Sequence, residues 1–167
     1  MLMQFVHVSL GAVLAVGLSQ SAMAQDSAST LLTISGEITL PSGDDTLSLD
    51  LDALMDLPVS TFETSTIWTD GVHSFTGVSL ADLAEELGIE DGQFIATAIN
   101  DYAVEIPLSD AVEGGPIIAY LMDGEEMTVR DKGPLWVIYP YDSDAEYRSE
   151  VVYSRSIWQL DRLEAVQ

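Results

Sequence analysis

Positive charge and aromatic rings occur together near the C-terminal end of this otherwise acidic chain. The sequence holds five basic residues against 28 acidic ones, and none of the five precedes residue 130. The basic residues are Arg130, Lys132, Arg148, Arg155 and Arg162, and among them lie Trp136, Tyr139, Tyr141, Tyr147, Tyr153 and Trp158. Arginine presents a planar set of donors that fits paired oxygens, and it stacks on aromatic faces. The segment RDKGPLWVIYP (130–140) therefore predicts a pocket for a flat, anionic or oxygen-rich ligand.

A structural role is the alternative for the same residues. The cations would then neutralise nearby carboxylates, and the aromatic rings would fill the core. Trp136 and Trp158 each stand inside an apolar stretch, so we expect both in the core. Arg130 and Lys132 stand beside Gly133-Pro134 at the start of a predicted strand, where either role is open.

The sequence offers little to metal or nucleophilic chemistry. It contains no cysteine, and after residue 24 its only histidine is His73. These residues cannot form an ordinary zinc or copper site, and no G-x-S-x-G motif is present. Asp142, Asp144 and Glu146 alternate as in a calcium loop, but Tyr147 stands where an EF-hand needs glycine. We interpret that segment as a solvated loop and His73 as a hydrogen-bonded surface residue.

Short strands and two helices account for most of the chain. Asp50 and Ser79 are suitable helix caps, and Gly88 stands where a left-handed helix end belongs. We predict helices over 49–58 and 77–89, strands over 31–40, 59–68, 93–100, 102–108, 134–140 and 155–165, and a hairpin over 116–129. Turns at Asn100-Asp101 and Asp123-Gly124 are typical of hairpins. The pattern indicates an α+β domain.

The N-terminus has the features of a secretory signal peptide. An apolar run from Phe5 to Leu18 precedes Ala22-Met23-Ala24, a small-x-small cleavage site. The run is shorter than the ~20 residues of a membrane-spanning helix, which argues against an uncleaved anchor. We expect a signal peptide over 1–24, a flexible leader over 25–30 and one domain over 31–167. The exported chain would begin at Gln25 and be periplasmic, with no membrane insertion after cleavage.

All charged side chains follow residue 24, so the predicted domain carries the whole formal net charge of −23. Nucleic acids and anionic lipids are bound mainly through Lys and Arg, and such a surface disfavours both. The charge indicates either solubility in salty surroundings or an electrostatic match to a basic partner.

Four segments carry a resemblance to a known family. They are HSFTGVSLADLAEELGI, ATAINDYAVEIPLSD, PIIAYLMDGEEMTVRDKGPLWVIYP and SRSIWQLDRLE. They resemble the molybdopterin-binding oxidoreductase domain of the sulfite-oxidase type, and more closely its small exported branch, over about residues 61–164. The resemblance implies a β-rich mixed-sheet domain with two or three short helices and a cleft shaped for a pterin.

The chain departs from that family at the metal ligand. In the enzymes a cysteine before the G-V-x-L helix holds molybdenum, whereas Thr64, Ser65 and Thr66 lie near that place here. A neutral hydroxyl does not replace a soft thiolate, so the resemblance does not carry enzymatic activity, and we expect no metal. Members without the cysteine are associated with binding reduced pterins and with controlling membrane-bound cyclic-di-GMP or histidine-kinase signalling.

For a pterin, the resemblance and the chemistry of the ring together predict the roles of individual residues. The ring needs a stacking surface, an acceptor for its N–H donors, and a cation or donor for its carbonyl oxygen. The candidates are Trp68, Tyr102 and Tyr139 for stacking, Asp101 and Asp131 as acceptors, Arg130 and Lys132 as cations, and Asn100 in either polar role.

The leading hypothesis is a periplasmic pterin-binding module that regulates a membrane-bound sensor, with the periplasmic domain of an inner-membrane signalling protein as its partner. Two alternatives stay open. One is an oxidoreductase that holds a molybdenum cofactor without a cysteine ligand, and the other is an acidic partner-binding protein with an empty cleft.

Overall fold

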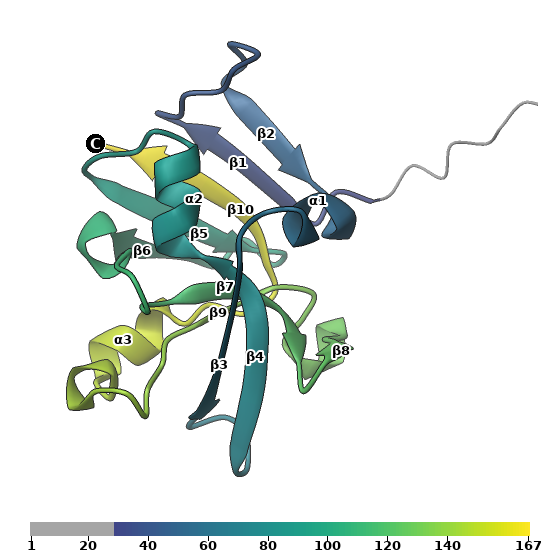
Figure 1. Cartoon of the computed structure of the whole chain (residues 1–167), viewed down its shortest axis with the longest axis vertical. Coiled ribbons are helices and arrows are strands. Elements are labelled where there is room, and N and C mark those ends of the chain that lie inside the picture. The colour runs from purple at the N-terminus through teal and green to yellow at the C-terminus, as the bar shows by residue number, and fades with distance from the viewer. Residues whose placement is uncertain (1–28) are drawn as a thin grey trace, which may run out of the picture.

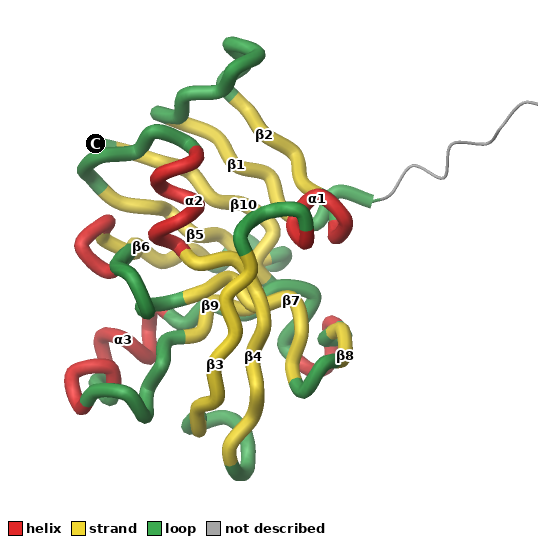
Figure 2. The backbone as a smooth tube through the Cα atoms, in the orientation of Figure 1, coloured by secondary structure: helices red, strands yellow, loops and turns green. Residues whose placement is uncertain are grey.

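Two sheets form the frame of this protein in the computed structural model, which describes residues 29–167 (Figures 1 and 2). The first sheet has the order β2-β1-β10-β5-β6, and the second has β3-β4-β7-β8 with β9 also paired to β7. In the first sheet β1 and β10 are parallel, and the other neighbours are antiparallel. The predicted signal peptide and most of the predicted leader lie outside the described residues.

The elements follow one another in short segments. The strands are β1 (Leu32–Gly36), β2 (Thr46–Leu49), β3 (Val59–Ser65), β4 (Val72–Ser79), β5 (Gln93–Ala98), β6 (Ala103–Pro107), β7 (Ile117–Met122), β8 (Glu125–Glu126), β9 (Trp136–Ile138) and β10 (Leu160–Val166). The helices are α1 (Leu51–Met55), α2 (Leu80–Glu86) and α3 (Glu150–Arg155), with single 3-10 turns η1 (Leu108–Asp110), η2 (Val129–Asp131) and η3 (Ala145–Tyr147). No helix among residues 29–167 is long and apolar enough to span a membrane.

Burial explains why these segments form strands. Residues of β5 and β10 alternate between buried and partly exposed, so the first sheet turns one face to the core. Strands β7 and β9 are nearly buried throughout, as expected for the interior of a sheet. One cluster of buried side chains joins both sheets to Leu80, Leu83 and Leu87 at α2.

The predicted α+β fold with mixed sheets and short helices is confirmed. Asp50 and Ser79 cap α1 and α2 as predicted, through bonds to the N–H groups of Ala53 and Asp82. The two predicted hairpins are β5–β6 and β7–β8. Gly88 has the left-handed φ of 66° that was expected of it.

Several predicted boundaries are wrong, among them that of the strand expected over 31–40, which is β1 (Leu32–Gly36). Residues 77–79 of the segment predicted as helical belong to β4, and the helix begins at Leu80, directly after the predicted cap Ser79. The strand expected over 59–68 ends at Ser65. The strand expected over 155–165 begins only at Leu160, because Arg155 ends α3, a helix that the sequence pattern did not predict. Strand β2 was also not predicted.

Gly133 holds the segment before β9 against the preceding turn. A Cβ atom at this position would overlap the carbonyl oxygen of Met127, which is backbone and cannot move aside easily. The N–H of Gly133 donates to the carbonyl of Thr128 at 2.8 Å. Gly133 therefore allows a close approach of two backbone segments, and this fixes the turn that carries Arg130 and Lys132 before β9.

Gly133→Ala should therefore destabilise the fold by roughly 3 kcal/mol, the upper part of the range for overpacking. The control is Gly114→Ala, where φ is 70° but no atom lies within 4 Å of the added Cβ. That variant should lose only about 1 kcal/mol, the conformational cost alone. Urea denaturation measures both values, and equal losses would show that the contact with Met127 does not constrain the backbone.

Candidate functional site

Two neighbouring cavities share a wall of two tryptophans, Trp68 and Trp158. The first, of about 410 Å³, is lined by Trp68, Ala98, Asn100, Tyr102, Tyr153, Ser154, Ser156, Ile157 and Trp158. The second, of about 300 Å³, is lined by Trp68, Val129, Arg130, Lys132, Trp158 and Gln159. The larger volume falls within the roughly 300–1,000 Å³ of small-molecule sites.

The two cavities differ in charge. Among the described residues, the only ionisable ones that line the first are Tyr102 and Tyr153, and four of its nine lining residues are aromatic. Arg130 and Lys132 both line the second. The site can therefore hold an uncharged flat ring on one side of the Trp68–Trp158 wall and an anionic or oxygen-rich group on the other.

Trp68 is the centre of the aromatic cluster behind the cavities. Its ring meets four others edge-on, with centroid distances of 5.7 Å to Trp136, 6.2 Å to Tyr141, 5.7 Å to Tyr153 and 5.8 Å to Trp158. These rings come from β9, from α3 and from the segments on either side of α3. Edge-to-face pairs are a favoured arrangement of aromatic rings, so the cluster fixes the angle of the Trp68 ring.

Local hydrogen bonds shape loop 66–71, which carries Trp68. The hydroxyl of Thr66 accepts from the N–H groups of Trp68 and Thr69 at 3.1 and 3.0 Å. The same hydroxyl lies 2.7 Å from that of Thr69. A threonine side chain that bonds to backbone two and three residues further on closes a turn, which explains why β3 stops before this point.

Asp142 secures the end of β3. Its carboxylate accepts from the N–H of Ser65 at 2.6 Å and from the Ser65 hydroxyl at 2.8 Å, and its own N–H donates to the Thr64 hydroxyl at 3.1 Å. The N–H and then the hydroxyl of Ser65 lower the pKa of Asp142 below its usual value. The acidic segment 142–146 thus holds, through its first residue, the strand that leads to Trp68.

Buried polar groups support the back of the first cavity. The indole N–H of Trp136 donates to the carbonyl of Ser156 at 3.1 Å, and the Tyr141 hydroxyl donates to the Ser156 hydroxyl at 2.6 Å. Burial raises the pKa of Tyr141 to about 12. These bonds fix the connection from α3 to β10, which carries Trp158.

The open side of the first cavity is formed by the β5–β6 turn. The side-chain oxygen of Asn100 accepts from the N–H of Tyr102 at 3.2 Å. Tyr102 and Trp158 remain 58% and 40% exposed. Both rings therefore offer surface to a ligand.

The cations of the second cavity are held without carboxylate partners. The Nζ atom of Lys132 lies 5.5 Å from the ring centre of Trp136 and 5.9 Å from that of Trp158. Within residues 29–167, no ion pair includes Lys132 or Arg130. Gln159 donates from its amide to the carbonyl of Val129 at 2.8 Å, which ties the two sides of this cavity together.

The structure brings together five of the residues predicted to bind ligand and leaves three outside. Trp68, Asn100, Tyr102, Arg130 and Lys132 line the cavities. Tyr139 does not, because its ring is fully buried and its hydroxyl donates to Asp110 at 2.7 Å. Tyr139 is therefore a core residue and no stacking surface.

The two predicted carboxylates line neither cavity. Asp101 is bound by Arg162 at 2.6 Å, and Asp131 accepts from the hydroxyl of Thr128 at 2.7 Å. Both are engaged next to the site and not in it. An acceptor for ligand N–H groups has to come from side chains or backbone of the cavity walls.

Several lining residues were not predicted from the sequence. The core assignment is correct for Trp136 but wrong for Trp158, which forms the wall between the cavities. Tyr153, Ser154, Ser156 and Ile157 were missed because α3 was missed. The capping residue Ser149 and the acidic Glu150 after it were the available signal for a helix start there.

A family model for the oxidoreductase molybdopterin binding domain matches residues 23–142. The chain belongs to this family. The structure is also similar to the sulfane dehydrogenase SoxCD from Paracoccus pantotrophus, with a TM-score of 0.59 and 16% sequence identity. That match covers 80% of this chain and 37% of the other chain, and at this identity it shows the fold alone. No curated protein matches the sequence.

The residues at the degenerate molybdenum-ligand position do not fit the metal of a molybdopterin. Thr64 is fully buried, and its hydroxyl donates to the carbonyl of Ser65 at 3.2 Å while accepting from Asp142. Ser65 and Thr66 are engaged with Asp142 and Thr69. These three hydroxyls hold the loop, and hydroxyls do not supply the thiolate that the metal takes in the family's enzymes. The aromatic cavity, by contrast, suits a flat heterocycle.

Asp142→Ala should lower the melting temperature and increase the exposure of Trp68 to a soluble quencher, because both bonds to Ser65 are lost. The contribution of Asp142 to stability is present above pH 3.8, the ordinary pKa of an aspartate, and is lost as the pH falls through its lower folded-state pKa. The acid-induced loss of stability should therefore be smaller in the variant. Glu146→Ala, in the same loop, is the control. Equal melting temperatures and quenching in both variants would refute the role of Asp142.

Proposed function

We propose that this protein binds a reduced pterin, with the ring in the first cavity and the substituent of the ring directed to Arg130 and Lys132. The observation that carries the proposal is the pair of cavities across the Trp68–Trp158 wall, one uncharged and aromatic and the other cationic. Membership of a molybdopterin-binding family supports a pterin as the flat component.

The first cavity has the groups that a pterin ring requires. Tyr102 and Trp158 offer partly exposed aromatic faces for stacking. The amide of Asn100 and the hydroxyl of Ser154 are polar groups of the lining that can pair with the N–H and carbonyl edge of the ring. Because these polar groups are neutral and no carboxylate of residues 29–167 lines the cavity, the lining favours an uncharged ring.

The two cations of the second cavity counteract the negative electrostatic potential of this chain. A net charge of −23 repels anionic and oxygen-rich groups from most of the surface. Arg130 and Lys132 offset this field locally, and both remain available because neither forms an ion pair within the described residues. An oxygen-rich substituent would be directed to this side of the Trp68–Trp158 wall.

We further propose that the protein acts in the periplasm as a module that reports pterin occupancy to a membrane-bound signalling protein. The apparent signal peptide over 1–24 supports export, and the resemblance to members without the metal-binding cysteine supports a regulatory role. A basic face on the partner would match the acidic surface. The alternative is a molybdenum oxidoreductase without a thiolate ligand, and it predicts that the native protein contains molybdenum.

Titration with tetrahydrobiopterin under anaerobic conditions tests the binding proposal. Calorimetry should show one site per chain, and Tyr102→Ala and Trp158→Ala should each weaken binding by about 1 kcal/mol, the range of an aromatic contact. Val112→Ala, an exposed apolar side chain that lines neither cavity, is the control. Elemental analysis of protein from its native host separates the alternatives, since stoichiometric molybdenum would support the enzyme and contradict the binding module.

Arg130→Ala should weaken binding of the pterin by roughly 1.5–3 kcal/mol, the usual contribution of a charge-assisted hydrogen bond, with little change in melting temperature. Arg148→Ala removes the same charge from an exposed residue that lines neither cavity, so it should leave affinity nearly unchanged. If the two variants lose affinity equally, only the overall charge matters and Arg130 makes no contact.

Association with the signalling partner should weaken as salt rises. At ~0.15 M salt, charges are felt over only about 8 Å, so long-range attraction between an acidic and a basic surface is largely screened. Surface plasmon resonance at low and high salt measures the association rate. A rate that stays constant would show that the acidic surface serves solubility alone.

A further inference from the structure

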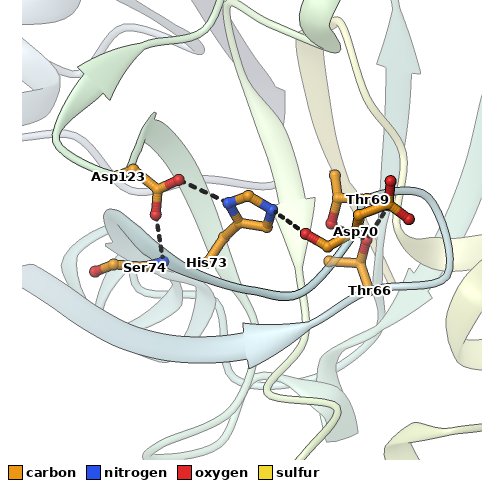
Figure 3. A network of polar contacts seen from close by, with 6 residues as sticks. All are labelled: Thr66, Thr69, Asp70, His73, Ser74 and Asp123. Atoms are coloured by element: carbon orange, nitrogen blue, oxygen red, sulfur yellow. Dashed lines mark hydrogen bonds and ion pairs between the residues drawn. The ribbon is translucent and has the colours of Figure 1, made fainter.

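His73, on β4, links loop 66–71 to the β7–β8 turn (Figure 3). Its Nδ1 atom lies 2.6 Å from Oδ2 of Asp123, and its Nε2 atom lies 3.0 Å from the backbone oxygen of Asp70. Asp123 is itself fixed, because its other carboxylate oxygen accepts from the N–H of Ser74 at 3.0 Å. The ring is thus held between a fixed carboxylate and the loop backbone.

Both partners of the ring can only accept hydrogen bonds. A neutral imidazole has one N–H group, whereas an imidazolium has two. Only the protonated ring can therefore donate to Asp123 and to the carbonyl of Asp70 at the same time. In the neutral ring the proton stays on Nδ1, because a carboxylate is the stronger acceptor, and the bond to Asp70 is lost.

The carbonyl of Asp70 belongs to the same loop as Trp68. The turn closed by Thr66 and Thr69 fixes the first part of this loop, as Figure 3 shows, and His73 fixes its far end. The tip between them holds Trp68, which lines both cavities. Loss of the hydrogen bond between His73 and Asp70 would therefore allow Trp68, and with it the wall of the ligand site, to move.

We propose that His73 is a positioning residue for the ligand site, whose protonated ring fastens loop 66–71 and so holds Trp68 in the shared wall. Deprotonation releases the far end of the loop and loosens this wall. The consequence for ligand affinity rests on the proposed function, whereas the effect on Trp68 does not.

The charges around the ring determine the direction of the effect. The charged groups that face it from neighbouring elements are Asp123 of the β7–β8 turn and Asp70 of the loop, while the residue opposite it on β3 is Thr64. The hydrogen bond to Asp123 raises the pKa of His73 above 6.5 against the opposing effect of desolvation. The contribution of the ring is therefore complete below pH 6.5 and is lost as the pH rises through the folded-state pKa.

The test compares the protein with His73→Gln, Asp123→Asn and, as a control, Glu90→Gln, which changes an exposed carboxylate between α2 and β5. Histidine proton NMR gives the pKa of His73, and acrylamide quenching of tryptophan fluorescence from about pH 5 to about pH 9 follows the loop without ligand. Quenching should rise with a midpoint at the pKa of His73. The step should vanish in His73→Gln, and it should stay unchanged in Glu90→Gln. In Asp123→Asn it should become smaller and move to lower pH, because the amide no longer holds the proton on Nδ1.

Calorimetry then measures the affinity for tetrahydrobiopterin at pH values below and above the midpoint of the quenching step. Affinity should be about two- to tenfold weaker at high pH, the range for one hydrogen bond, and independent of pH in His73→Gln. If His73 titrates while quenching stays constant, or if the step persists in His73→Gln, the positioning role is refuted and pterin binding stands. If tetrahydrobiopterin binds at no pH but the quenching step behaves as expected, the pterin proposal fails and the positioning role is supported.

Discussion

The position of Trp68 is the constraint on which the site depends. This ring belongs to a loop, yet four other rings surround it, and it separates an uncharged cavity from a cationic one. Side-chain packing alone would leave the loop backbone free to move. The hydroxyl of Thr66 and the carboxylate of Asp142 remove that freedom by bonding to backbone N–H groups on either side of the end of β3.

Thr64, Ser65 and Thr66 have a structural role at the position where the family's enzymes carry the metal-binding cysteine. In an enzyme of the family, a side chain at this place would be reserved for the metal. Here the three hydroxyls bond to Asp142, to Thr69 and to backbone, so they have become part of the support for Trp68. The departure from the family pattern therefore coincides with a structural role that a thiolate, which has no proton to donate, would perform less well.

Local patterns predicted the elements that depend on local chemistry, and failed where distant contacts decide. The caps at Asp50 and Ser79 and the turn at Asp123-Gly124 were predictable because each depends on a few adjacent residues. The role of Trp158 was not, since an apolar neighbourhood in sequence does not reveal that its ring stands between two cavities. Asp101 is a similar case, because its partner Arg162 lies 61 residues away on β10.

The basic residues near the C-terminus have two different roles, which the sequence alone does not distinguish. Arg155 pairs with Asp110 at 2.9 Å, and Arg162 pairs with Asp101 at 2.6 Å, so these two cations serve the fold. Lys132 instead lies near the faces of two indole rings, which attract a cation without neutralising it. An acidic protein can keep a cation available for a ligand only where no carboxylate reaches it. The tryptophans provide that environment, and for this reason the charge and the aromatic rings occur in the same segment.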